Sequence, residues 1–181
     1  MEAFSPSVWF PVVTLVVGVL LKAVFDAWTE NRKSALDKML RVEKRKEIIL
    51  MQRIDLQRKA LGDLQVALSD LIRSTNLIHL HDAKMYREGS EWGVESTPDG
   101  LGETIRNNFR SVTLTRVRVS DEGVRKLAGD LSALCTQVTL SRTEDQADEA
   151  MRSSSVLYSS INEKIGEALR SLEHEEQALL I

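Results

Sequence analysis

One short stretch, IHLHDAKMYRE, holds most of the side chains in this chain that are suited to chemistry. It places His79, His81, Asp82 and Tyr86 within eight positions. On a helix, His79 and Asp82 would share a face, as two metal ligands must, while His81 would point elsewhere. Two ligands do not make a metal site, and the chain has only one further histidine, His174. We therefore interpret the cluster as polar residues at the end of a helical bundle and predict no metal site and no cofactor.

The other reactive residue types form no catalytic pattern. The single cysteine, Cys135, is flanked at helical spacing by Leu131, Leu134 and Val138, which predicts a buried thiol. No serine lies in a G-x-S-x-G turn, and the sequence has no phosphate-binding glycine loop and no paired-cysteine motif. We expect a protein that is not an enzyme and has no small-molecule substrate.

Composition favours an all-α fold. Among 181 residues there are three prolines, nine glycines and 5% aromatic residues, which is poor material for a many-stranded β fold. The formal net charge is −3, yet residues 29–59 hold ten basic and five acidic residues. These bases alternate with acids and no aromatic residue lies between Trp28 and Tyr86, so the segment does not suit nucleic acid.

A long apolar segment follows a short tail at residues 1–7. Residues 8–28 read VWFPVVTLVVGVLLKAVFDAW, and about 20 apolar residues in a helix span the ~30 Å hydrocarbon core of a bilayer. The tail carries Glu2 and no base, and bulky Phe25 lies where a cleaved signal peptide needs a small residue. We predict a single transmembrane anchor in the lipid bilayer.

The ends of this segment predict its depth and orientation. Trp9, Lys22, Asp26 and Trp28 are expected at the membrane interface, where the Lys22 stem lets its ammonium reach the headgroups and Asp26 pairs with it one turn on. Basic residues close to the segment follow it and do not precede it, which predicts an inner-membrane protein with its N-terminus outside and its C-terminus in the cytoplasm. The bases expected to contact the leaflet are Arg32, Lys33, Lys38, Arg41, Lys44, Arg45 and Lys46.

Two alternatives remain open for these charges. Lys22 and Asp26 could instead pair with another span, which would make the chain an accessory subunit of a membrane transport or signalling complex. The basic run could also reflect ordinary pairing along an exposed helix, for example of Glu43 with Lys46.

The remaining sequence predicts a helical stalk, residues 29–45, and an antiparallel bundle, residues 46–181. Apolar residues at alternating spacings of three and four form a coiled-coil-like seam: Leu61, Leu64, Leu68, Leu71, Thr75 and Ile78. A glycine-rich loop is expected at 88–102, and Thr143 with Gln146 makes a capping box for a last helix. Near Asp121 we favour a kink within one long helix, which gives three helices; a turn there would give four.

Trp92 in the glycine-rich loop has two interpretations. We favour a plug packed over the end of the bundle, and the alternative is an exposed contact for a partner. The layout resembles that of bacterial single-pass membrane proteins. Taken together, the sequence predicts a single-pass membrane-anchored helical interaction or scaffold protein that assembles with itself or with a protein partner.

Overall fold

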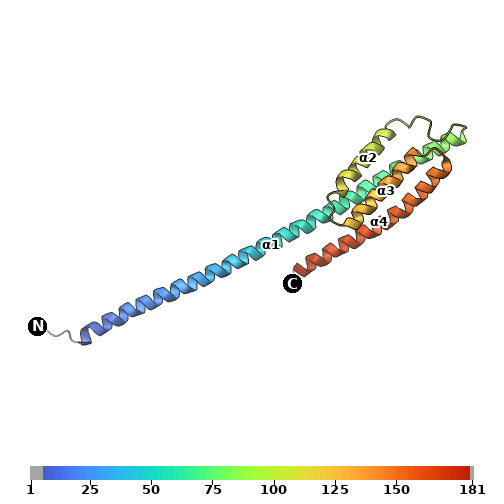
Figure 1. Cartoon of the computed structure of the whole chain (residues 1–181). Coiled ribbons are helices and arrows are strands. Elements are labelled where there is room, and N and C mark those ends of the chain that lie inside the picture. The colour runs from blue at the N-terminus through green and yellow to red at the C-terminus, as the bar shows by residue number, and fades with distance from the viewer. Residues whose placement is uncertain (1–5, 180–181) are drawn as a thin grey trace. The chain divides into compact units, whose positions relative to one another are not determined.

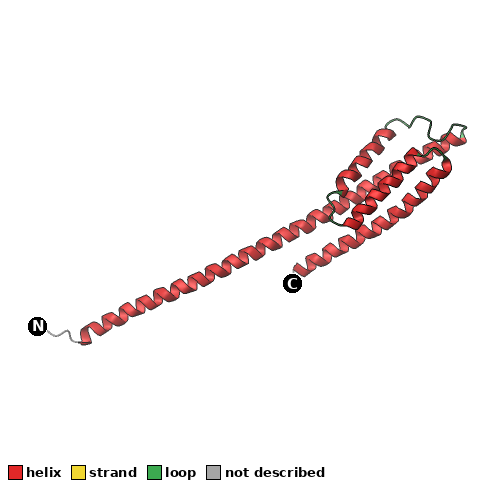
Figure 2. Cartoon of the chain, in the orientation of Figure 1, coloured by secondary structure: helices red, strands yellow, loops and turns green. Residues whose placement is uncertain are grey.

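The computed structural model describes the backbone of residues 6–179 and, residue 35 apart, the side chains of residues 13–179. All its regular elements are helices, as predicted (Figure 2). They are α1 (Pro6–Arg87), α2 (Leu101–Arg116), α3 (Glu122–Leu140) and α4 (Glu144–Leu179). The chain divides into two compact units, residues 1–50 and residues 51–181.

The second unit is an antiparallel four-helix bundle. Residues 51–87 of α1 supply its first helix, and α3 lies between α2 and α4 with successive helices running in opposite directions (Figure 1). Hydrogen bonds connect α1 to two other helices. Asn108 on α2 donates to the Asp70 carbonyl oxygen of α1 at 3.0 Å, and Gln65 of α1 donates to the Asn162 side chain of α4 at 2.9 Å. The prediction of a helical bundle is confirmed.

The seam predicted on α1 forms one wall of the core. All six of its residues, from Leu61 to Ile78, are buried. They pack with residues of the other helices that include Val112, Leu131, Cys135 and Ile161. Burial raises the pKa of the Cys135 thiol, so this cysteine serves as a small apolar side chain.

Small residues let α4 approach its neighbours over its first three turns. Ala147, Ala150 and Ser154 are buried there, and the Ser154 hydroxyl donates to the Met151 carbonyl oxygen at 2.8 Å. Thr143 caps this helix, because its hydroxyl accepts from the Gln146 backbone N–H at 3.4 Å. Further along α4, larger side chains such as Ile161 and Ile165 fill the core.

The kink favoured near Asp121 is wrong, because a turn separates α2 from α3. Asp121 caps α3 by accepting from the Val124 N–H at 2.8 Å, and Val119 is buried beneath the turn. The side chain of Gln57 on α1 makes two hydrogen bonds to the turn. It donates to the Arg118 carbonyl oxygen at 3.1 Å and accepts from the Ser120 N–H at 2.7 Å. A continuous helix would lose all of these contacts.

In the first unit the described residues belong to α1. No helix among the described residues is both long enough and apolar enough to cross a membrane. The expected anchor begins at residue 8, and the side chains of residues 8–12, including the predicted interface residue Trp9, lie outside the described part.

Candidate interaction surfaces

The most apolar surface of the first unit lies on α1 between residues 13 and 28. Ten large apolar side chains are exposed there by between 41% and 69%, on all sides of the helix. They are Val13, Leu15, Val16, Val17, Val19, Leu20, Leu21, Val24, Phe25 and Trp28. Exposed apolar surfaces of this kind are typical of segments that contact a membrane or another protein.

The polar residues within this surface are exposed. Lys22 and Asp26 lie one turn apart on α1, and both are exposed. Trp28 has the guanidinium of Arg32 above its ring, 5.0 Å from the centroid. The pairing of Lys22 with Asp26 at a membrane interface stays a prediction.

The basic segment that follows is exposed along its length. None of the salt bridges among the described residues involves a base between Arg32 and Lys46, so the alternative of ordinary pairing along the helix receives no support from the structure. Its apolar residues are exposed as well: Leu36, Met39, Leu40, Val42, Ile48, Ile49 and Leu50. Their contact with a leaflet stays a prediction.

The histidine cluster lies at the end of the bundle near the 88–100 loop. His79 Nε2 is 2.7 Å from a carboxylate oxygen of Asp148 on α4, so this pair links α1 to α4. Burial raises the pKa of the Asp82 carboxyl, and the neighbouring His79 and His81 lower it less. No group of three or more His, Cys, Asp or Glu side chains among the described residues could hold a metal ion.

Trp92 covers this end of the bundle. It is only 4% exposed and packs edge-on against His79 and Tyr86, with ring centroids 5.6 and 5.9 Å away. Gly93 has φ +67°, and a Cβ there would lie 3.2 Å from the Ser141 carbonyl oxygen, so glycine lets the loop pass close to α3. Trp92 therefore packs over the end of the bundle as a plug, and its buried ring is not accessible to a partner.

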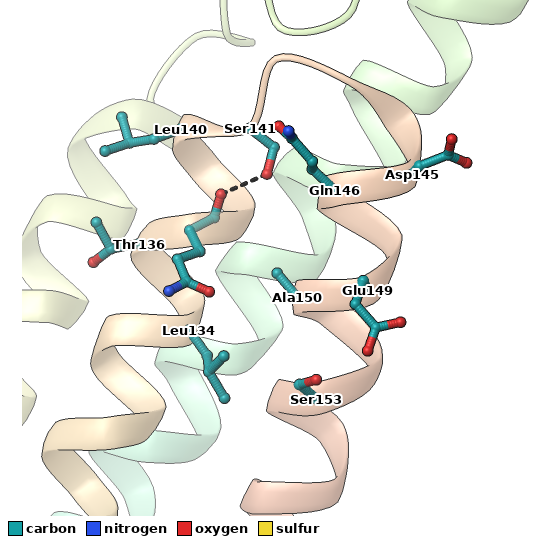
Figure 3. Close-up of a pocket in the computed structure, with 10 residues that line it drawn as sticks. Leu134, Thr136, Leu140, Ser141, Asp145, Gln146, Glu149, Ala150 and Ser153 are labelled. Carbon is teal, nitrogen blue, oxygen red and sulfur yellow. Dashed lines mark hydrogen bonds between the residues drawn. The ribbon is translucent and has the colours of Figure 1, made fainter.

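A groove on the same end of the bundle escaped sequence analysis. It encloses about 610 Å³ between the last two turns of α3 and the first three turns of α4. Figure 3 shows Thr136 and Leu140 along its α3 side and Asp145 and Glu149 along its α4 side. Its lining is Leu134, Thr136, Gln137, Leu140, Ser141, Asp145, Gln146, Glu149, Ala150 and Ser153.

The two sides of this groove differ in chemistry. Leu140 is 70% exposed, which is a large exposed fraction for a leucine at a helix end, and Leu134 is half-buried nearby. Across the groove, α4 carries the exposed carboxylates of Asp145 and Glu149, which point outward and away from α3 (Figure 3). One sequence signal was available, since Leu140 lies outside the helical spacing of Leu131, Leu134 and Val138.

Comparison with known proteins found no family model, no curated protein and no solved structure that matches this chain.

Proposed function

We propose that this chain is a single-pass membrane-anchored interaction protein, with the N-terminal part of α1 in the bilayer and the helical bundle in the cytoplasm. The observation that carries the proposal is the apolar surface of residues 13–28, whose ten large side chains are exposed on every side of the helix. Water is a poor surrounding for such a surface, whereas lipid surrounds a helix on all sides at once.

The charges at the end of this surface are compatible with a shallow position. Lys22 extends its ammonium toward the headgroups, and the Trp28 ring under the Arg32 guanidinium suits the interface. Seven bases follow within 20 residues of Trp28, which supports a cytoplasmic bundle. Each base near an anionic leaflet contributes about 1 kcal/mol to attachment.

Membrane extraction tests the anchor. In cells that express the full chain, the protein is expected to stay in the membrane fraction after washing at high salt and at alkaline pH. Val17→Asp with Leu20→Asp places two charges in the proposed span and is expected to release the protein. Met39→Asp with Val42→Asp adds the same charge on exposed apolar positions of the stalk and should leave it bound. Release of the unmodified chain by alkaline washing would exclude the anchor.

A reporter fused to either end tests the orientation. A reporter after residue 181 is expected to be active in the cytoplasm, and one before residue 2 outside it. The opposite result would remove both the cytoplasmic bundle and the leaflet contact from the proposal.

A second role is supported by one observation, the exposed position of both Lys22 and Asp26 within the apolar part of α1. Charges in or near a bilayer pair with opposite charges of neighbouring spans, as in an accessory subunit of a transport or signalling complex. Replacing both with leucine keeps the net charge and tests this role. Loss of a co-purifying membrane protein, with the chain itself retained in the membrane, would support the accessory role; an unchanged complex would exclude it.

A further inference from the structure

We infer that the groove between α3 and α4 binds an amphipathic helix of a partner protein, one that carries lysine or arginine along one edge of an apolar face. The inference rests on the proposed role as an interaction protein and names the chemistry of its partner.

The two unlike sides of the groove define this partner. An apolar helix face would cover Leu140 and Leu134 on the α3 side. The neighbouring edge of the same helix would meet the carboxylates of Asp145 and Glu149 on the α4 side (Figure 3). Only a helix with apolar and basic positions side by side satisfies both.

The negative charge here exceeds what α4 needs for its own stability. Acidic residues in a first helical turn interact favourably with the helix dipole, and this accounts for Glu144 and Asp145. Glu149 lies beyond that turn, and Glu91 lies in the loop beside an adjoining hollow that shares Asp145 with the groove.

The nearby bases compensate only part of this charge. Arg142 lines the adjoining hollow, and Arg152 donates to Glu149 at 2.9 Å between side chains that are both largely exposed. An exposed pair of this kind is weak and exchanges readily for a stronger partner. The groove therefore presents net negative charge beside exposed apolar surface, which complements a basic amphipathic helix.

The length of the groove sets the size of the contact. Asp145 to Ser153 covers eight steps of α4, or about 12 Å at 1.5 Å per residue. A partner helix would place about two turns in it, with apolar anchors three, four and seven positions apart.

Binding of a designed helical peptide tests the inference. The probe is an 18-residue peptide with leucine on one face and lysine on the other, labelled for fluorescence anisotropy, and the protein is the full chain in neutral detergent. Asp145→Lys with Glu149→Lys turns two attractions into repulsions and is expected to weaken binding at least about tenfold. Leu140→Ser removes apolar contact and is expected to weaken it about tenfold.

A matched control lies on the same helix. Glu163 and Glu167 have the same spacing of four, and Glu167 pairs with Lys164 much as Glu149 pairs with Arg152. Glu163→Lys with Glu167→Lys therefore changes the net charge equally and should leave peptide affinity within about twofold, since exposed surface pairs away from the contact contribute little. A peptide with glutamate in place of lysine is expected not to bind.

Three results would overturn the inference. Equal weakening by both charge reversals would mean general attraction to an acidic protein, and equal binding of the glutamate peptide would mean apolar adhesion alone. If Asp145→Lys with Glu149→Lys instead dissociates a homo-oligomer in sedimentation, the occupant is a second copy of this chain. The assay does not depend on membrane insertion, so its failure is distinguishable from failure of the proposed anchor.

Discussion

The helix α1 contributes to both units of the chain, but among its described residues only those of the second unit form a buried apolar face. In the bundle, Leu64, Leu68 and Leu71 are buried by the other three helices. In the first unit, Leu20, Leu36 and Ile49 are exposed. The residue types are the same, so burial depends on whether the rest of the chain supplies a covering surface. Where it does not, as along residues 13–28, we propose that a bilayer surrounds the apolar side chains.

The largest expected effect on stability comes from placing a carboxylate in the core of the bundle, compared with placing one on the exposed stalk. Leu131 is fully buried at 0% exposure, and Leu36 is 57% exposed. Leu131→Asp must bury an unpaired carboxylate and is expected to cost several kcal/mol, enough to abolish cooperative unfolding. Leu36→Asp leaves its carboxylate in water, so unfolding of the bundle should be unchanged. Circular dichroism during thermal unfolding of the full chain measures both.

A similar response from the two variants would remove the contrast. If Leu36→Asp were as damaging as Leu131→Asp, the stalk would be covered by another chain and would belong to an obligate assembly.

A smaller effect is expected at the turn that makes the bundle four-helical. Asp121→Ala removes the acceptor of the Val124 N–H and is expected to cost about 1 kcal/mol of unfolding free energy. Asp121→Asn, which keeps a side-chain acceptor, should recover most of that loss. The measurement is urea unfolding, and an unaffected midpoint for Asp121→Ala would mean that Gln57 alone sets the turn.

Most of the bundle could be predicted from the sequence, because helical periodicity is a local property of the chain. The seam from Leu61 to Ile78, the capping residue Thr143 and the loop around Trp92 all follow from spacing and residue type within short windows. The turn before Asp121 could not be found in this way. It depends on Gln57, which lies 63 residues before Ser120 and has no local signature.

The candidate binding groove was hidden from sequence analysis for a related reason. Ala147, Ala150 and Ser154 hold α4 close to its neighbours, but small residues add little to a hydrophobic pattern. Whether Leu140 is exposed depends on where α2 and α4 lie, which is a property of the whole bundle. The apolar segment of residues 8–28 was conspicuous in sequence for the opposite reason, since its apolar residues form one nearly continuous run.

Burial of the Asp82 carboxyl makes the stability of the bundle depend on pH. Desolvation raises the pKa of Asp82 above its ordinary value of about 3.8, so the folded protein binds this proton more tightly than the unfolded chain does. The contribution of Asp82 to stability is therefore fully present below about pH 3.8 and is lost as pH rises through the raised pKa. Asp82→Asn should be more stable than the unmodified chain at pH 7.

The comparison needs measurement at two pH values. The difference between Asp82→Asn and the unmodified chain in urea unfolding is expected to shrink toward zero near pH 3.5, about where even an unperturbed carboxyl is largely protonated. Asp63→Asn, at an exposed position of the same helix, should show little change at either pH. A constant advantage for Asp82→Asn at both pH values would mean that hydrogen bonding by the amide, and not the carboxylate charge, is responsible.

The smallest expected effect is that of deleting residues 1–45, which make up most of the first unit. Ile54 is the first residue of α1 that is buried in the core, so a fragment of residues 46–181 keeps every core side chain. It should be soluble and highly helical, and it should unfold cooperatively. A fragment of residues 73–181 loses Leu61, Leu64, Leu68 and Leu71 and should be unfolded, because α2, α3 and α4 then lack the helix that covers them. If circular dichroism instead found residues 46–181 unfolded, the bundle would need the membrane or a second chain to fold, and the contrast between the two parts of α1 would disappear.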